Sequence, residues 1–435
     1  MKFLVVCPDY ASHATPMLQV GIAWQHRGGE TVVATGEAVR PLVDAAGLGW
    51  AHLRLGKGSN AGVIRPEEQP LGEDDHLRAF FDATRAGPLA TLRYQTDARR
   101  HDLLNEPDRV LDDLRRIVTH VAPDRVLVDH VAFGARLALH ALGIEAAAIV
   151  LGHPSALPAA GEIYGLPPAW PAAMRPSGAG LADLERRCRE STADLAAAAN
   201  DLITRRAPDR PFVDDLTALP GSPTIYVYPQ ALHDPRRPLP AGSVSVGALV
   251  RDEELGDVTL PTGDGPRVLV ALGSFLSARD DVLATAVAAA RAGRWGLTLA
   301  HGSTPAERLG DLPSGALVAP HLPQVAVLRH TDVMISHGGN NSVGEACAAG
   351  VPMVVLPFST DQFAGAAAIE RAGLGIVLDP NTLTAGALVA AVTAVLQSVA
   401  PDRARALAVS IRESGGAARA VEAIRGNDCQ GAGLS

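Results

Sequence analysis

The sequence is poor in the residues that mark several classes of protein. Only four of its 435 residues are cysteine, and only 4% are aromatic. Cys7, Cys188, Cys347 and Cys429 form no CxxC pair and have no histidine at ligand spacing, which argues against structural zinc and against a disulfide framework. We therefore expect a protein of a reducing compartment, the cytoplasm.

Long apolar runs and basic clusters are also missing. No segment approaches the ~20 apolar residues that cross a bilayer, and the apolar run in MKFLVVCPDY at the N-terminus is too short for a signal peptide. The formal net charge is −9 and no run is rich in Lys and Arg, so a nucleic-acid backbone would be repelled. We expect neither a membrane span nor a nucleic-acid partner, and a monomer or homodimer that binds small molecules.

What the sequence does contain is the alternation of a two-domain α/β protein. A chain of 435 residues is too long for one ordinary core. Short β-rich apolar runs alternate with longer helical patterns, which is typical of parallel sheets covered by helices. The pattern predicts strands at 3–7, 31–35, 125–129 and 146–151, and a second series at 268–272, 297–300, 316–319, 333–336, 353–356 and 375–378.

The composition between the two series sets the expected domain boundaries. Residues 216–262 belong to a stretch heavy in Pro, Asp and Gly, and are predicted to link a Rossmann-like domain at 1–215 to another at 263–405. Residues 406–435 are expected to form a C-terminal helix and tail that could cross back to the first domain. Doubly wound domains bind ligands at the carboxyl ends of their strands, so functional residues should lie in loops that follow strands.

The strongest motif follows the predicted strand 333–336. The turn His-Gly-Gly at 337–339 leads there into a helix. A helix N-terminus presents unpaired N–H groups and a partial positive charge, which attract phosphate, and glycine lets the backbone approach a ligand closely. His337 and Ser342 can donate hydrogen bonds to phosphate oxygens. Glu345, further along the helix, can accept them from two hydroxyls of a sugar.

This segment resembles the donor-binding signature of family 1 nucleotide-sugar glycosyltransferases, the group with bacterial natural-product enzymes. The matching positions are Pro323-Gln324, His337, Gly339, Asn341-Ser342, Glu345, Gly350-Val351-Pro352, Pro357 and Asp361-Gln362. The resemblance implies the GT-B fold, in which two doubly wound Rossmann-like domains face each other across a cleft. It also implies inverting, metal-independent transfer from a UDP- or dTDP-sugar to a small-molecule acceptor, with no cofactor beyond that co-substrate.

The resemblance further implies roles for individual residues of the donor site. His337 and Ser342 would hold the diphosphate, and Glu345 the ribose. Asp361 and Gln362 would bind hydroxyls of the transferred sugar. The complete expected donor-binding set is Ser274, His321, Gln324, His337, Gly339, Asn341, Ser342, Glu345, Asp361 and Gln362.

Two members of this set lie outside the central motif. Ser274, after the strand 268–272, matches the family's Gly-Ser/Thr loop and would reach the β-phosphate. His321 stands where many family members carry a Trp that stacks on the nucleobase. An imidazole stacks less strongly than an indole, so UDP and dTDP both remain open as the nucleotide.

A histidine near the first strand has the features of a general base. His13 is expected in the loop before Pro16, and an imidazole titrates close to neutral pH, which suits removal of a hydroxyl proton. His-Ala-Thr-Pro resembles the family's His-x-x-Pro, whose histidine is the base. Asp129, at the end of the strand 125–129, would orient it, as in hydrolase triads. Because strand neighbours point to opposite faces, only one of Asp129 and His130 should face the cleft.

Other functions and the acceptor stay open. Alternatives on the same fold are a nucleotide-sugar epimerase or hydrolase, and a non-catalytic auxiliary partner of a glycosyltransferase. No GxGxxG motif opens either half, and no Asp-x-Asp motif is placed to hold a metal. The acceptor, such as a polyketide, macrolide or phenolic compound, is expected against residues 56–90 and 152–180. Lining candidates there are Phe80, Phe81, His153, Tyr164 and Trp170.

Overall fold

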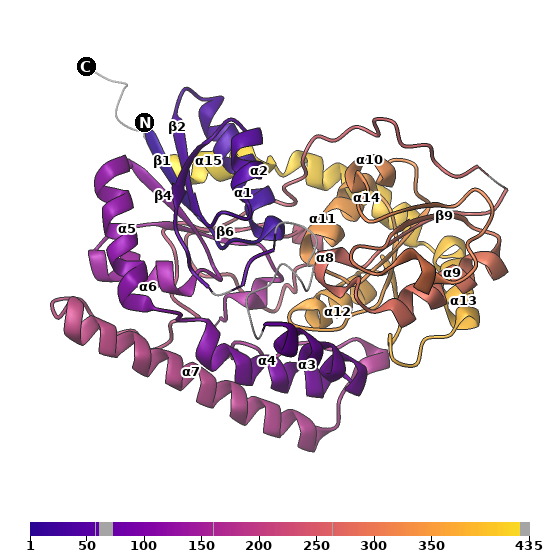
Figure 1. The fold of residues 1–435 in the computed structure, drawn as a ribbon, viewed down its shortest axis with the longest axis horizontal. Coiled ribbons are helices and arrows are strands. Elements are labelled where there is room, and N and C mark those ends of the chain that lie inside the picture. Colours follow the sequence, from indigo (N-terminus) through magenta and orange to yellow (C-terminus); the bar gives the residue numbers. More distant parts are fainter. Residues whose placement is uncertain (57, 61–72, 160, 263, 427–435) are drawn as a thin grey trace.

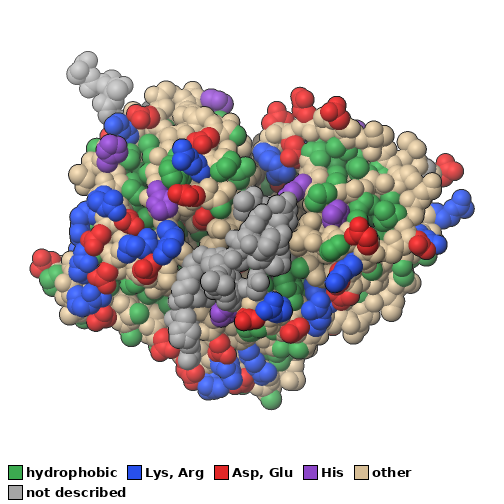
Figure 2. Space-filling model, in the orientation of Figure 1, with side chains coloured by type: hydrophobic (Ala, Val, Ile, Leu, Met, Phe, Trp, Pro, Cys, Tyr) green, Lys and Arg blue, Asp and Glu red, His purple; other side chains and the backbone are tan. Residues whose placement is uncertain are grey.

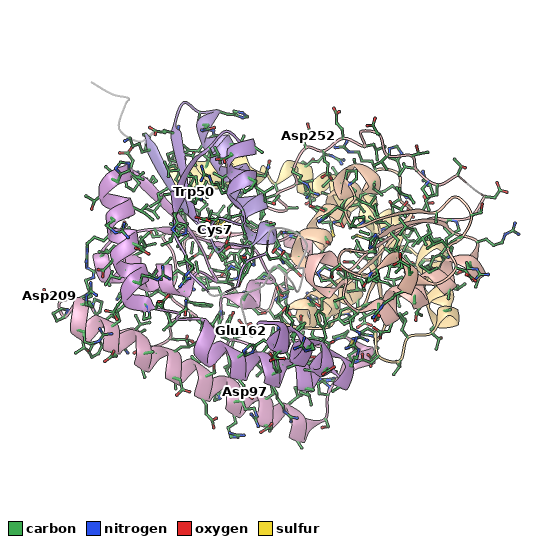
Figure 3. All side chains as sticks on the ribbon, in the orientation of Figure 1. Cys7, Trp50, Asp97, Glu162, Asp209 and Asp252 are labelled. Atoms are coloured by element: carbon green, nitrogen blue, oxygen red, sulfur yellow. The ribbon has the colours of Figure 1, made fainter. Side chains whose placement is uncertain are left out.

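Two α/β halves lie side by side in the computed structural model, which describes residues 1–435 except 57, 61–72, 160, 263 and 427–435 (Figure 1). Each half is built on one parallel sheet with helices packed against it. The doubly wound arrangement predicted from the alternating pattern is confirmed. In Figure 3, Cys7 lies inside the first half, whereas Asp209 and Asp252 lie at the outside of the molecule.

The first sheet has the strand order β3-β2-β1-β4-β5-β6-β7, and all of its pairings are parallel. Its strands are β1 (Lys2–Val6), β2 (Glu30–Thr35), β3 (Gly49–His52), β4 (Arg125–Asp129), β5 (Ala147–Val150), β6 (Thr224–Tyr226) and β7 (Ser243–Ser245). The chain builds outward from β1 in one direction and from β4 in the other. The switch point between β1 and β4 is therefore where a ligand site is expected.

The second sheet repeats this order with β10-β9-β8-β11-β12-β13, again with parallel pairings. Its strands are β8 (Arg267–Ala271), β9 (Gly296–Ala300), β10 (Leu317–Ala319), β11 (Val333–Ser336), β12 (Met353–Val355) and β13 (Gly375–Val377). Its switch point lies between β8 and β11, so β11 occupies the place that β4 has in the first sheet.

Helices cover both sheets. Those before residue 210 are α1 (Ala11–Gln25), α2 (Arg40–Ala45), α3 (Glu73–Ala86), α4 (Pro88–Asp102), α5 (Pro107–Val121), α6 (Phe133–Leu142) and α7 (Gly178–Arg206). Those after it are α8 (Gly273–Leu276), α9 (Asp280–Gly293), α10 (Gln324–Leu328), α11 (Asn340–Ala349), α12 (Gln362–Ala372), α13 (Ala385–Gln397), α14 (Ala400–Glu413) and α15 (Gly416–Arg425). Short 3₁₀ turns are η2 (Pro154–Ala156), η3 (Ala172–Met174), η4 (Gln230–Leu232) and η5 (Ala306–Leu309).

The central strands are apolar on both faces because each face meets a layer of helices. In β1, Phe3 and Val5 join the core cluster that includes α1 and α15, whereas Leu4 and Val6 join the cluster that includes α5 and α6. Every residue of β11 is buried. These continuous apolar runs are what made the central strands predictable from the sequence.

The expected linker needs correction, because part of it belongs to the first sheet. Residues 216–262 contain β6 and β7, which pair with each other and extend the sheet from β5. Each of these strands has three residues. A strand that short gives almost no periodic signal, so the surrounding Pro and Gly dominated the prediction.

Two helices cross between the halves. The C-terminal α15 packs beside α1 through Ala420, Val421 and Ile424, and Arg27 forms an ion pair with Glu422 at 2.7 Å (Figure 1). In the opposite direction, α3 places Phe80 in the core of the second half. Each half therefore contributes a helix to the other.

The described residues contain no single helix that is both long and apolar enough to span a membrane. Ala385–Gln397 and Ala400–Arg425 pass such a test only as a pair, bent by 65°.

Candidate functional site

A cavity of about 610 Å³ lies between the halves, where both sheets present the carboxyl ends of their strands. Its walls include the segments that follow β1, β4 and β5 and part of α3 in the first half, and the segments that follow β8, β11 and β12 in the second. Figure 2 shows a notch between the two halves at the top of the view. Because both switch points open into this cavity, it is the candidate ligand site.

His13 and Asp129 meet at the edge of this cavity. His13 Nδ1 lies 2.6 Å from Asp129 Oδ2, and the side chain of His13 is 25% exposed while Asp129 is fully buried. The Val131 N–H donates to Asp129 Oδ1 at 3.0 Å, and His130 Nδ1 lies 3.1 Å from the same oxygen. One carboxylate oxygen of Asp129 is thus held by Val131 and His130, and the other fixes the Nδ1 edge of the His13 imidazole.

This contact alters the protonation of both groups. Burial opposes protonation of His13, but the charge and hydrogen bond of Asp129 outweigh it and raise the pKa of the imidazole above its ordinary value. Burial alone would raise the pKa of Asp129, yet His13 and His130 hold it well below its usual range. Asp129 is therefore an anion at neutral pH, and it stabilises the protonated form of His13.

One sequence expectation about this corner was wrong. His13 lies in the first turn of α1, not in a loop, because the helix begins at Ala11 and contains Pro16. As expected, only one of Asp129 and His130 lines the cavity, and it is His130. The alternation of β4 ends at Asp129, so the next residue is free to turn toward the cavity while Asp129 contacts His13 beneath it.

The turn after β11 surrounds His337 with glycine. Gly338 has φ +83°, a conformation that favours glycine. A Cβ at Gly339 would lie 2.2 Å from His337 Nε2, and one at Gly273 would lie 2.9 Å from Cε1. Burial lowers the pKa of His337 to about 4, so at neutral pH the imidazole is uncharged and can donate one N–H.

Glu345 lies in a polar cluster on α11. Gln324 Nε2 donates to Glu345 Oε2 at 2.6 Å and to Ser342 Oγ at 3.3 Å, and Arg251 Nη1 donates to Glu345 Oε1 at 2.5 Å. Burial raises the pKa of Glu345, and Arg251 and Gln324 counter this. The structure thus brings together three predicted donor residues, Gln324, Ser342 and Glu345.

Arg251 is a member of this cluster that sequence reasoning missed. Its guanidinium also pairs with Glu253, whose carboxylate accepts the N–H of Val325 at 2.8 Å. Arg251 comes from the irregular stretch before β8, far from α11 in sequence. No local pattern marked it. An Arg followed by acidic residues in an irregular stretch indicates a solvent-exposed loop rather than a binding site.

The other predicted donor residues after β12 line the cavity at its boundary with the first half. Asp361 Oδ2 accepts the N–H of His153 at 2.6 Å. Gln362 is buried, and its Oε1 accepts the N–H groups of Phe358 and Ser359 at 3.0 and 3.2 Å. Gln362 therefore holds the loop after β12, while Asp361 reaches across to the first half.

Asn341, at the start of α11, also contacts the first half, through the carbonyl of Ser12. Two other predicted donor residues give less information. Ser274 lies in α8, but its side chain is outside the described part of the structure. His321 is exposed in the loop after β10, away from the described lining of the cavity.

The candidate acceptor residues divide into two groups. Phe80 and Tyr164 line the cavity. Trp170 instead packs on Phe363 with ring centroids 5.0 Å apart, and His153 packs on Tyr228 at 5.3 Å. Phe81 packs against the core of the second half. Part of the expected acceptor segment 56–90 lies outside the described residues.

The described residues contain no group of three or more His, Cys, Asp and Glu side chains that could hold a metal ion.

Comparison with known proteins links this geometry to a family. Residues 251–402 match the family described as UDP-glucoronosyl and UDP-glucosyl transferase. The chain is 27% identical to NDP-glycosyltransferase YjiC of Bacillus subtilis (strain 168) over 329 residues, 74% of this chain and 77% of that protein. It is 35% identical to demethyllactenocin mycarosyltransferase of Streptomyces fradiae over 171 residues, 38% of this chain and 36% of that protein.

Solved structures share the whole fold at lower identity. The glycotransferase of kitacinnamycin superposes with a TM-score of 0.69 at 23% identity and covers 98% of each chain. Spinosyn rhamnosyltransferase SpnG complexed with thymidine diphosphate gives 0.65 at 20% identity and covers 98% of this chain and 100% of that one. The match over residues 251–402, the relatives and the two facing doubly wound sheets together show a glycosyltransferase with the GT-B fold.

Proposed function

We propose that this glycosyltransferase moves a sugar from a UDP- or dTDP-sugar to a hydroxyl of a small-molecule acceptor, with inversion at the anomeric carbon and without a metal ion. The observation that carries the proposal is the distance of 2.6 Å between His13 Nδ1 and Asp129 Oδ2. His13 lines the same cavity as the N-terminus of α11. A candidate base and a helix N-terminus able to bind an anion thus line the same cavity.

The His13–Asp129 pair supplies the base. Because Asp129 accepts from Nδ1, the other ring nitrogen, Nε2, is the one that takes the acceptor proton. The acceptor oxygen then forms its bond to the anomeric carbon while the bond from that carbon to the diphosphate oxygen breaks. The nucleotide diphosphate leaves with the electron pair. Attack from the side opposite the leaving group inverts the anomeric configuration.

The second half supplies the groups that meet the leaving diphosphate. The N–H groups at the start of α11, the neutral His337 and the hydroxyl of Ser342 can donate to phosphate oxygens. The family resemblance adds Ser274 to this set. Fixed donors of this kind stabilise the charge that grows on the leaving group. They support the metal-independent part of the proposal.

The remaining donor residues are assigned to the nucleoside and the sugar. Glu345, held by Gln324 and Arg251, keeps carboxylate lone pairs that can accept from the ribose hydroxyls. We assign Asp361 and Gln362 to the transferred sugar, since both line the cavity next to the turn after β11. Asp361 would then exchange its bond to His153 for a sugar hydroxyl.

Natural-product acceptors are supported by the relatives and by the cavity. Relatives include oleandomycin glycosyltransferase of Streptomyces antibioticus, 32% identical over 43% of that protein. The acceptor side of the cavity has apolar walls formed by Leu77, Phe80, Tyr164 and Leu166. A polyketide, macrolide or phenolic compound with a free hydroxyl suits such walls.

The proposal is tested by thermal unfolding with UDP, dTDP, GDP and NAD, each with and without EDTA. A ligand that binds only the folded state raises Tm. At a hundredfold excess over Kd it adds about 2.7 kcal/mol to the free energy of unfolding. We expect UDP or dTDP to raise Tm equally with and without EDTA. A response to NAD alone, or a nucleotide effect that EDTA abolishes, would contradict the proposal.

A further inference from the structure

Two consecutive asparagines at the start of α11 bond backbone carbonyls of the first half. Asn341 Nδ2 donates to the carbonyl of Ser12 at 2.6 Å. Asn340 Nδ2 donates to the carbonyls of Leu151 and Val227 at 2.7 and 2.8 Å. We call these two side chains the Asn340–Asn341 clamp, because both reach from the phosphate-binding turn across the cavity boundary.

The Ser12 carbonyl is available because of Pro16. In an α-helix each carbonyl accepts from the N–H four residues later, and the residue four after Ser12 is Pro16, which has no N–H. The His-Ala-Thr-Pro sequence therefore leaves an unpaired carbonyl one residue before His13. Asn341 supplies the missing donor from the other half of the molecule.

Asn340 likewise donates to backbone carbonyls of the first half. Leu151 follows β5 and Val227 follows β6, so both carbonyls lie at the carboxyl edge of the first sheet, next to the cavity. The two hydrogens of one amide nitrogen serve two acceptors on neighbouring strands. The start of α11 is thereby bonded both to α1, which carries His13, and to the residues that follow β5 and β6.

We propose that the Asn340–Asn341 clamp positions His13 and the acceptor side of the cavity against the diphosphate site, and that neither asparagine is a donor ligand. This rests on the proposed function and changes the role expected for Asn341 from the family resemblance. Inverting transfer requires the acceptor oxygen, the anomeric carbon and the leaving oxygen in one line, with the base within hydrogen-bond reach of the acceptor. A misplacement of about 1 Å can cost roughly a hundredfold in rate. The clamp sets that alignment.

The test separates nucleotide binding from positioning in Asn340→Ala and Asn341→Ala. Isothermal titration with UDP and dTDP gives Kd, and kcat is measured with the sugar nucleotide and acceptor that the wild-type enzyme uses best. We expect Kd to stay within about threefold of wild type while kcat falls about tenfold or more in each variant. Hydrogen exchange of the unliganded proteins should become faster near residues 11–15 in Asn341→Ala and near Leu151 and Val227 in Asn340→Ala.

Asn381→Ala is the matched control. Asn381 Nδ2 also donates to a carbonyl of the first half, that of Thr84, at 2.8 Å, but far from the turn after β11 in sequence and outside the described lining of the cavity. This variant should leave kcat and exchange near residues 11–15 unchanged.

The role of Asn341 can also be tested through Pro16. Pro16→Ala restores an N–H for the Ser12 carbonyl, so Asn341→Ala should reduce kcat less in that background than in wild type. A tenfold rise in Kd with unchanged exchange would make the asparagines donor ligands and overturn the proposal. If wild-type protein binds no diphosphate, the proposed function fails, while the exchange measurements still decide whether the clamp exists.

Discussion

The two halves present different chemistry at equivalent places in their sheets. β4 and β11 hold the same position in the strand order. β4 ends in Asp129 and β11 in Ser336, and each strand is followed by a histidine, His130 and His337 respectively. In the first half a histidine, His13, packs against the carboxylate. In the second half Ser336 stands in the place of that carboxylate, and His337 packs between Gly273 and Gly339.

This difference gives two histidines opposite protonation behaviour. Both are drawn toward the neutral form by burial, but only His13 has a carboxylate in contact, so its pKa rises while that of His337 falls to about 4. A raised pKa suits a group that must hold a proton during transfer. A lowered pKa keeps a neutral N–H donor over the whole working range. The neighbour, and not the residue type, decides which protonation state is favoured.

The largest expected effect comes from removing the base. His13→Ala should lower kcat about 10²–10⁴-fold, the usual contribution of general-base catalysis, while leaving the Kd of UDP or dTDP unchanged. Steady-state kinetics and calorimetric titration measure the two effects. His26→Ala, an exposed histidine just after α1, is the control and should behave as wild type. Equal transfer by His13→Ala and wild type would contradict the proposed mechanism.

The next effect concerns the carboxylate. Asp129→Asn should reduce kcat roughly 10²-fold or more, because the protonated imidazole loses its counter-charge. The base acts when neutral, so wild-type kcat/KM should rise with pH through the raised pKa of His13. Without the negative charge that pKa falls, and the acid limb of the profile moves to lower pH. A pH–rate profile of both proteins checks the direction, and a limb that stays in place would assign it to another group.

The smallest effect is expected at the other histidine. His337→Ala should weaken UDP or dTDP binding about tenfold, the value of one hydrogen bond to a charged group. Since the pKa of His337 is about 4, the imidazole stays neutral from pH 6 to 9, and the loss in affinity should be constant over that range. Titrations at several pH values measure it. A loss that grows at low pH would show that His337 binds as a cation.

The sequence alone predicted the elements that have strong local patterns. The apolar runs of β4 and β11 were predicted at their observed limits, and the His-Gly-Gly turn was correctly set before a helix. The short strands β6 and β7 and the early start of α1 were missed. A three-residue strand lacks periodicity, and Pro16 suggested a helix start where the helix in fact continues.

The sequence by itself determined the fold class and predicted two groups of candidate site residues, because the strand runs, the His-Gly-Gly turn and the His-Ala-Thr-Pro segment are all local. Only the tertiary structure decided how those groups meet. The His13–Asp129 contact joins residues 116 positions apart, and the Asn341 contact with Ser12 joins residues 329 apart. The position of Arg251 beside Glu345 likewise depends on how an irregular segment packs. Such contacts leave no periodic trace along the chain, since they are set by the packing of two sheets against each other.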